Sequence, residues 1–407
     1  MRAVSIKACR VCGHPNFARF LDLGEMVPCG VFPVSAETQP AKEPLVVVRC
    51  LDCGLVQLAH DLPLEDTFNE GFGYRSATNP TMRRHLEDLA KHLYGAADLK
   101  PGDLVIDIAS NDGTFLAALP SSVRKVGVDP VARAYEEFYP VDAVVHADFW
   151  SDDLAREYAG QAKAITCFAA LYDLPDPNAF MRAVAFALEP GGVFMAEVAA
   201  LPMMLATGAF DLISHEHLMY FHWHPLDRLM RQHGLAVDWP NVSANPTNGG
   251  SVLFTARKTE GLIEPWGAHQ PSREDIGRFV ARVRTIQAQV RGFLMGAQSD
   301  GKIVHGLCAS TRGNTLLQSV GANADCVQAI SDKNPAKSGR LTPGSLITII
   351  SPENSRAQEP DYYFCLSWHY QNLAEEEAAF LERGGTLVYP FPNNLRFVTK
   401  ESMADAL

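Results

Sequence analysis

Two histidines flank a glutamate in the middle of this chain, within the run Ile213-Ser214-His215-Glu216-His217-Leu218-Met219-Tyr220-Phe221. Imidazole titrates near neutral pH without help, and a neighbouring carboxylate can orient it, so the cluster could supply a general base. Taken alone, the same residues could also bind a metal ion or lie in a solvated loop. The elements around the run must decide between these alternatives.

A second group of reactive side chains lies near the N-terminus. Four of the nine cysteines form two C-x-x-C pairs, and each pair is followed directly by a glycine. Thiolates two residues apart on a tight turn can share one metal ion, and two such pairs complete the tetrahedral shell of zinc. A redox pair is the alternative, but neither pair stands at a predicted strand-to-helix junction. We predict a closed structural zinc site on Cys9, Cys12, Cys50 and Cys53, with Cys29 as a bystander. The histidine run then need not bind a metal.

Length and charge limit the possible classes of protein. A chain of 407 residues exceeds one hydrophobic core and suggests roughly two to three domains. A net charge of −12 argues against nucleic-acid and anionic-membrane partners, because both require a basic face. No apolar run approaches the ~18 residues of a membrane span, and no signal core precedes the first cysteine. We therefore expect a cytoplasmic protein.

Residues 100–200 show the alternation of strands and helices that is typical of a nucleotide-binding domain. A buried strand at 104–109 leads into Ser110-Asn111-Asp112-Gly113-Thr114 and a helix at 115–119. A glycine at such a bend allows a ligand close to the backbone, and the helix N-terminus offers free N–H groups. Asp129 ends the next strand, where a carboxylate can bind both ribose hydroxyls. Asp148 and Phe149 follow a third strand and suit an adenine, and further strands are expected at 164–168 and 193–197.

The last third of the chain predicts a second open α/β sheet. Residues 272–294 form an amphipathic helix that begins with a capping box of Ser272 and Asp275. Strands at 302–306, 326–331, 362–366 and 386–390 and a helix from Asn314 complete the pattern. The loop after the first of these strands lacks the G-x-G-x-x-G spacing, so we do not assign NAD to it.

Taken together, these segments resemble the S-adenosylmethionine (SAM)-dependent sugar C-methyltransferases that act on nucleotide-linked keto-deoxysugars. The resemblance covers nearly the whole chain, through the cysteine pairs, Phe72-Gly73-Tyr74-Arg75-Ser76, residues 110–114, 210–217, 248–251 and 306–315. It implies an α/β chain of three parts: a zinc-binding lobe over residues 1–63, a Rossmann-like SAM methyltransferase domain over 64–258, and a Rossmann-like substrate-binding domain over 259–407. The implied cofactors are SAM and a structural Zn²⁺.

The same resemblance implies roles for individual residues. His217 would remove a proton from the carbon beside a ketone, Glu216 would orient this base or contact the sugar, and Tyr74 would lie near both substrates. The resulting enolate carbon would attack the sulfonium methyl group in line. Cofactor contacts are implied at Asp107, Ala109, Ser110, Asn111, Asp112, Gly113, Asp129, Asp148, Phe149 and Phe168. Substrate contacts are implied at Ser214, His215, Tyr220, Asn248, Arg312 and Asn314, although a purely structural turn would also explain the last two. His222 and His224 are expected to be surface or packing groups.

Four positions depart from the pattern of the family. Ser214 replaces a tyrosine, Ala169 and Asp173 replace an asparagine and a histidine, and Ala109 replaces a glycine. We therefore expect the acceptor, its oxidation state or the methylated carbon to differ from those of relatives. The alternatives are a methyltransferase for a non-sugar acceptor, a SAM-binding homologue without catalysis, and a zinc-ribbon nucleic-acid module fused to a methyltransferase. The sequence leaves a monomer and a homodimer equally open.

Overall fold

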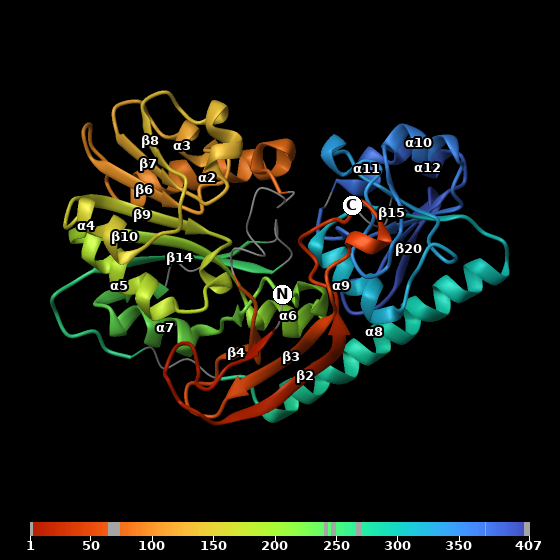
Figure 1. The fold of residues 1–407 in the computed structure, drawn as a ribbon, viewed down its shortest axis with the longest axis horizontal. Coiled ribbons are helices and arrows are strands. Elements are labelled where there is room, and N and C mark those ends of the chain that lie inside the picture. The colour runs from red at the N-terminus through yellow and green to blue at the C-terminus, as the bar shows by residue number, and fades with distance from the viewer. Residues whose placement is uncertain are drawn as a thin grey trace.

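The computed structural model describes residues 3–63, 74–239, 243–245, 250–265, 270–370 and 372–402. Three larger sheets organise the chain, together with a small pair of β1 (Val4–Ser5) and β5 (His60–Asp61). Figure 1 shows the central unit at upper left and the C-terminal unit at upper right, both above the N-terminal sheet. The mixed α/β class predicted from the sequence is confirmed.

The N-terminal sheet consists of β2 (Phe17–Met26), β3 (Glu43–Cys50), β4 (Val56–Leu58) and β11 (Met219–Tyr220), all antiparallel. Side chains along β3 alternate between buried and half-buried, as expected where one face of a sheet meets the core. The strand β11 comes directly after the histidine run, and it pairs with β4. The zinc lobe therefore anchors the segment that carries His217.

The central sheet has the order β12-β14-β10-β9-β6-β7-β8, and β13 pairs with β14. Its strands are β6 (Leu104–Ile108), β7 (Arg124–Val128), β8 (Ala143–His146), β9 (Ala162–Phe168), β10 (Leu188–Ala199), β12 (Leu235–Val237), β13 (Ser243–Asn245) and β14 (Ser251–Lys258). Strands β6 to β10 run parallel, whereas β14 is antiparallel to β10. The strands predicted between residues 104 and 197 are confirmed.

Helices cover both faces of this sheet, which explains why every residue of β6 is buried. On one face, α2 (Pro80–Ala96) and α3 (Thr114–Ala118) pack in one cluster with Val105. On the other face, Ile106 packs with residues of α4 (Asp152–Glu157), α5 (Pro177–Ala187) and α7 (Trp223–Gln232). The α2 helix begins at Pro80, where the Asn79 side chain accepts a hydrogen bond from the Thr81 N–H.

The C-terminal sheet has the order β17-β16-β15-β18-β19-β20, and only β20 is antiparallel. Its strands are β15 (Val304–Leu307), β16 (Ala329–Ser331), β17 (Ile349–Ile350), β18 (Tyr362–Cys365), β19 (Thr386–Tyr389) and β20 (Arg396–Val398). The helices around it include α9 (Thr311–Val320), α10 (Pro352–Ala357), α11 (Leu373–Glu376) and α12 (Ala378–Glu382). The second α/β sheet is confirmed, but α9 begins three residues before Asn314, because Ser310 caps it through the Gly313 N–H.

One long helix, α8 (Arg273–Ser299), joins the first and third units (Figure 1). It begins with the predicted capping box of Ser272 and Asp275. Near its start Phe279 meets Phe20 of β2, with ring centroids 5.7 Å apart, and near its end Phe293 meets Tyr362 of β18 at 5.2 Å. Among the described helices, none has both the length and the apolar character needed to cross a membrane.

Candidate active site and zinc centre

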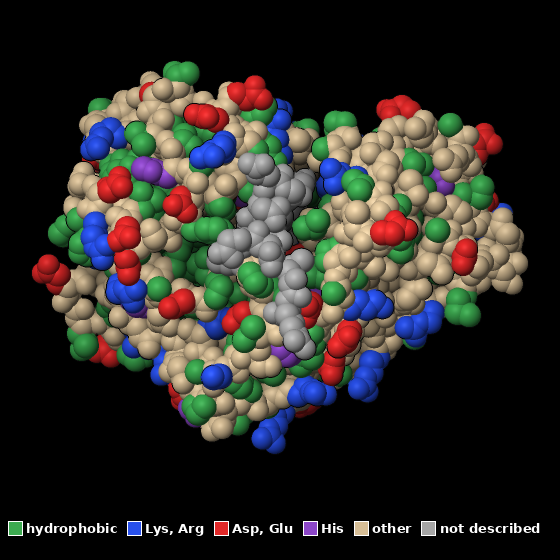
Figure 2. Space-filling model, in the orientation of Figure 1, with side chains coloured by type: hydrophobic (Ala, Val, Ile, Leu, Met, Phe, Trp, Pro, Cys, Tyr) green, Lys and Arg blue, Asp and Glu red, His purple; other side chains and the backbone are tan. Residues whose placement is uncertain are grey.

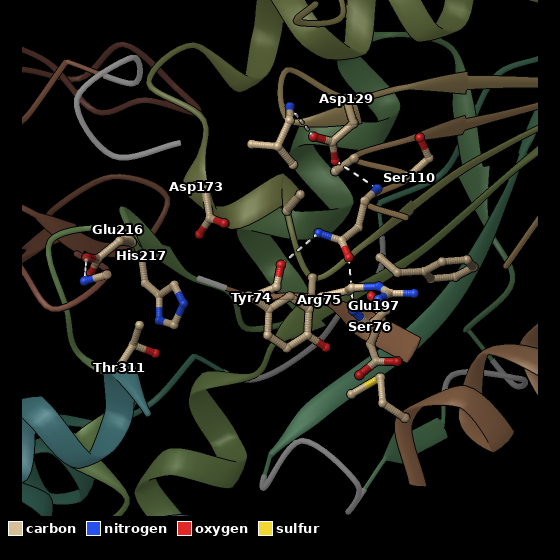
Figure 3. A pocket seen from close by; sticks show the side chains of 18 of the residues that line it. Tyr74, Arg75, Ser76, Ser110, Asp129, Asp173, Glu197, Glu216, His217 and Thr311 are labelled. Atoms are coloured by element: carbon tan, nitrogen blue, oxygen red, sulfur yellow. Dashed lines mark hydrogen bonds between the residues drawn. The ribbon is translucent and has the colours of Figure 1, made fainter. Parts of the chain in front are cut away.

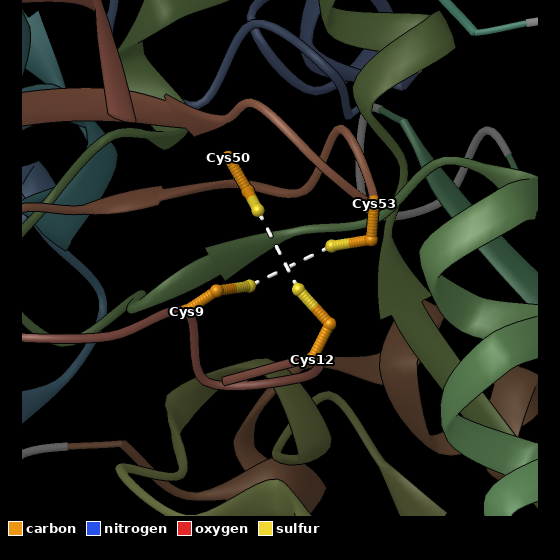
Figure 4. A group of neighbouring side chains, drawn as sticks. All are labelled: Cys9, Cys12, Cys50 and Cys53. Carbon is orange, nitrogen blue, oxygen red and sulfur yellow. Dashed lines mark hydrogen bonds between the residues drawn. The ribbon is translucent and has the colours of Figure 1, made fainter. Parts of the chain in front are cut away.

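The four cysteines of the two C-x-x-C pairs converge on one point (Figure 4). Their sulfur atoms all lie within 4.8 Å of one another, with Cys9 and Cys53 3.6 Å apart and Cys12 and Cys50 3.5 Å apart. A tetrahedral zinc with Zn–S bonds of about 2.3 Å would place its sulfurs roughly 3.8 Å apart. The cluster therefore fits the predicted structural zinc. The Cys29 thiol lies elsewhere, 3.5 Å from the Thr315 hydroxyl, as expected of a bystander.

Two histidines of α7 and its cap hold the second cysteine pair from outside. A ring nitrogen of His222 lies 3.2 Å from the Gly54 carbonyl oxygen, and one of His224 lies 3.1 Å from that of Cys53. A carbonyl only accepts, so each imidazole donates an N–H to the metal-binding turn. Their predicted packing role is confirmed, and it links the zinc lobe to the central unit.

A cavity of about 930 Å³ lies where the three units meet. Gly30 and Phe32 of the N-terminal lobe contribute to its wall, together with the carboxyl ends of the central strands and residues 308–312, 332–337 and 367–376 of the C-terminal unit. Figure 2 shows this face hollowed between the central and C-terminal units, with hydrophobic side chains on the wall. The volume lies near the upper end of the range for small-molecule sites.

Asp129 dominates the cofactor half of the cavity (Figure 3). At the end of β7, one of its oxygens accepts from the Asn111 N–H and the other from the Val131 N–H, both at 2.8 Å. Each oxygen keeps a further lone pair, so the carboxylate can still bind the two hydroxyls of a ribose. Burial raises the pKa of Asp129. Its contact with the ribose of SAM stays a prediction.

The other residues predicted to contact the cofactor fall into two groups, those on the cavity wall and those behind it. Ala109 lies on the wall with a φ of +60°, a left-handed conformation that glycine adopts more readily than alanine. Asp107 also reaches the wall but accepts from the Thr166 hydroxyl at 2.6 Å. Ser110, Asn111, Asp148, Phe149 and Phe168 line the cavity as well.

Asp112 and Gly113 do not line the cavity but support residues that do. The Asp112 carboxylate accepts from Arg75 Nε at 3.1 Å and from the Ala77 N–H at 3.0 Å, so it holds the segment that carries Tyr74. Gly113 starts α3 with a φ of +72°, and a Cβ there would lie 2.7 Å from the Tyr139 ring. Tyr74 itself faces the cavity opposite His217 (Figure 3).

His217 presents a free nitrogen to the other half of the cavity. Its Nδ1 lies 2.7 Å from the Leu212 carbonyl oxygen, and this hydrogen bond assigns the ring proton to Nδ1. No hydrogen bond reaches Nε2 from the described residues. The Tyr172 ring meets the imidazole edge to face, with centroids 5.0 Å apart. Burial lowers the pKa of His217, so its neutral form, with a lone pair on Nε2, prevails at neutral pH.

Glu216 does not orient His217. One of its oxygens accepts from the Gly30 N–H at 2.6 Å, and the other is buried without a hydrogen bond from the described residues. The hydrogen bond that orients the His217 ring goes to the Leu212 carbonyl instead. Of the two roles implied for Glu216, the contact with the sugar stays a prediction.

Four of the implied substrate contacts point into the protein interior and do not line the cavity, namely Ser214, His215, Tyr220 and Asn314. His215 donates to the Glu43 carbonyl at 3.2 Å, and the Asn314 side chain donates to the Cys29 carbonyl at 3.0 Å. Both contacts join the N-terminal lobe to the rest of the chain. Asn248 lies outside the described residues.

Arg312 lies on the cavity wall but is bound to Asp211. Its Nε and one terminal nitrogen donate to the two carboxylate oxygens at 2.9 and 3.1 Å, and Trp368 Nε1 donates to the same group at 2.9 Å. The two side chains are only 9% and 1% exposed. Because Asp211 precedes Leu212 directly, this ion pair connects the C-terminal unit to the residue that orients His217.

Sequence reasoning missed several polar groups on the cavity wall or directly behind it. Asp211 belongs to the run 210–217 that carries the resemblance, but nothing in its spacing indicated a partner 101 residues away. His85 of α2 and Glu197 of β10 form a pair 2.6 Å apart on the wall. Asp173 also lines the cavity, and only its departure from the family pattern drew notice to it.

Three family patterns match consecutive parts of the chain: a zinc binding domain over residues 9–68, a methyltransferase domain over 76–238, and a C-methyltransferase C-terminal domain over 266–392. C-methyltransferase NovU of Streptomyces niveus is 30% identical over 419 residues, which cover 98% of each chain. A ubiquinone biosynthesis O-methyltransferase of Xanthomonas axonopodis pv. citri is 30% identical over 138 residues, or 32% of this chain and 58% of its own. The structure of the CurJ carbon methyltransferase matches 46% of this chain and 57% of its own at 11% identity, with a TM-score of 0.35.

The zinc cluster, the central sheet and the site around Asp129 define a SAM-dependent methyltransferase with a structural zinc. Since its three regions and its full-length relative agree, the chain belongs to the C-methyltransferase family. The resemblance stated from the sequence is thereby confirmed.

Proposed function

We propose that this enzyme methylates the carbon beside the ketone of a nucleotide-linked keto-deoxysugar, by way of an enolate. The observation that carries the proposal is Nε2 of His217, which has no hydrogen bond from the described part of the chain and shares one cavity with the Asp129 carboxylate. A neutral imidazole with a free lone pair can remove a proton, and the proton on a carbon next to a ketone is acidic enough to be removed.

The reaction needs little more from the chain than position and protection from water. SAM supplies an electrophilic methyl group when bound. His217 Nε2 takes the carbon-bound proton, while the Leu212 carbonyl holds the ring in the required tautomer. The new C–C bond forms as the C–S bond breaks, so the products are the methylated ketone, S-adenosylhomocysteine and a protonated His217. The half-buried surroundings of His217 keep bulk water away from the carbanion.

The C-terminal side of the cavity supports a nucleotide-linked acceptor. Residues that follow β15, β16 and β18 line it, and the carboxyl ends of parallel strands are where open α/β sheets bind ligands. Lys333 and Lys337 lie on this wall, paired with Glu376 at 2.7 Å and Asp332 at 3.9 Å, and their ammonium groups are the donors that this side offers to a diphosphate. The volume of about 930 Å³ leaves room for an acceptor next to the cofactor.

The test is methyl transfer from labelled SAM to a panel of dTDP-, GDP- and CDP-linked 4-keto sugars, read by mass spectrometry as the gain of one methyl group. A His217→Ala variant should bind SAM normally but lose at least 10²-fold in kcat, about the contribution of a positioned base. His92→Ala, at an exposed position of α2, is the matched control and should keep full activity.

Proton removal can be measured apart from transfer. With S-adenosylhomocysteine in place of SAM, the wild type in D₂O should exchange the hydrogen next to the ketone, and His217→Ala should not. No product from any keto sugar, together with normal SAM binding, would remove the sugar assignment. Full activity of His217→Ala would rule out His217 as the base.

A further inference from the structure

Two carboxyl groups lie buried on the cavity wall within electrostatic reach of each other. Asp173 ends the short helix η4 (Leu171–Asp173), which follows β9, and Glu216 belongs to the histidine run. They are 7% and 5% exposed, and neither forms an ion pair with a described residue. Two neighbouring carboxylates that are both ionised and buried would repel each other at a high cost in free energy, so one carboxyl group holds its proton.

Their hydrogen bonds indicate which group is protonated. One oxygen of Glu216 accepts a short hydrogen bond of 2.6 Å from the Gly30 N–H, so this carboxyl group has a donor. No hydrogen bond from the described residues reaches either oxygen of Asp173, and its Oδ1 is fully enclosed. Burial and the nearby charge of Glu216 raise the pKa of Asp173 well above its ordinary value. The proton therefore resides on Asp173.

The Asp173 carboxyl group points into the part of the cavity where the acceptor would bind. Ala169 follows β9 directly with a φ of +55°, and the chain turns there so that Tyr172 and Asp173 reach the wall. In Figure 3 the Asp173 carboxyl group points toward the space between His217 and Tyr74. Arg312 lies on the same wall, but two of its nitrogens bind Asp211.

We infer that Asp173 is a neutral carboxylic acid that donates a hydrogen bond to the ketone oxygen of the acceptor and to the enolate oxygen that forms from it. This inference rests on the proposed function and adds the group opposite the base. The negative charge on the enolate oxygen is stabilised by a donor already in place, as in an oxyanion hole. Asp173 keeps its proton through the reaction: His217 holds the proton from carbon, and the ketone is restored when the methyl group arrives.

Two substitutions distinguish a role of Asp173 as a hydrogen-bond donor from a role as a negatively charged carboxylate. Asp173→Ala removes the donor and should lower kcat about 10²- to 10³-fold, the usual effect of losing one oxyanion-hole donor. Asp173→Asn keeps an N–H donor and should retain activity within about tenfold of the wild type. Asp88→Asn, in an exposed ion pair on α2, is the control and should be unchanged. Equal losses in Asp173→Asn and Asp173→Ala would overturn the inference, because they would mean that the negative charge matters.

The pH profile gives a reading that a merely structural carboxyl group would not change. Because the neutral acid is the donor, kcat of the wild type should fall as pH rises through the pKa of Asp173, and Asp173→Asn should lack this alkaline limb. Infrared spectra without any substrate should show the carbonyl band of a protonated carboxyl group at neutral pH, absent from Asp173→Asn. A wild-type protein without that band would also overturn the inference.

These outcomes also distinguish the two proposals. If the wild type methylates a keto sugar and Asp173→Ala is equally active, the donor role fails and the proposed function stands. If the wild type methylates none of the keto sugars although SAM binds, the proposed function fails, and the donor role fails with it.

Discussion

The buried ion pair between Arg312 and Asp211 should be the most sensitive link between the C-terminal unit and the run that carries His217. Replacement of Arg312 by methionine keeps most of the side-chain volume but leaves the Asp211 carboxylate, 1% exposed, without its cation. Removal of one partner from a buried pair costs about 3–5 kcal/mol. The Trp368 N–H still donates to Asp211 at 2.9 Å, so we take the lower end, about 3 kcal/mol.

A loss of this size should be visible in thermal unfolding. For units of this length, about 3 kcal/mol corresponds to a fall in Tm of roughly 6–12 °C, measured by calorimetry. Arg312→Met combined with Asp211→Asn removes the isolated charge and should recover part of this loss. The control is Arg278→Met, whose ion pairs on α8 are exposed, and its Tm should change by about 1 °C or less.

Activity should respond through the position of His217. Since Asp211 precedes Leu212, which binds His217 Nδ1, Arg312→Met should lower kcat more than it weakens SAM binding. A single variant that melts within about 2 °C of the wild type would refute the reasoning, because a buried unpaired carboxylate must carry a cost. A double variant that is less stable than Arg312→Met would refute it as well.

Three further predictions concern the zinc, the cofactor and the base. Chelation of zinc, or Cys53→Ser, should release one zinc per chain and unfold the N-terminal lobe, visible by limited proteolysis, since zinc binding contributes directly to folding. Asp129→Ala should raise the Kd of SAM about 10- to 100-fold by calorimetry, at about 1.4 kcal/mol per tenfold, whereas His217→Ala should leave this Kd unchanged. Because His217 must be neutral to act and burial lowers its pKa, kcat/KM should stay level as pH falls to 6.5 and decline only below it; a decline already complete at pH 6.5 would contradict this assignment.

Short-range patterns predicted the framework well. The zinc site follows from the spacing of the cysteine pairs, because two residues on a tight turn set the positions of both thiolates. The strands around Asp129 follow from apolar runs, since a strand buried on both faces admits few polar residues. The capping box at Ser272 marked the start of α8 for the same local reason.

Long-range contacts were beyond such patterns. Nothing local indicates that β11 completes the sheet of the zinc lobe, because Tyr220 and its partner Val56 are far apart in the sequence. The same holds for the Asp211–Arg312 pair. Ser214 and Tyr220, which the resemblance assigned to the substrate, are instead buried in the protein interior.

The sequence by itself determined the zinc site and the strands of the methyltransferase sheet, since each depends on residues close in the chain. Only the tertiary structure decided which atom of His217 is available, because the Leu212 carbonyl takes the other nitrogen. It also decided that Glu216 and Asp173 share one buried wall, where their charges oppose each other. Protonation depends on burial and on neighbours in space, and both exist only once three distant parts of the chain have closed around a common cavity.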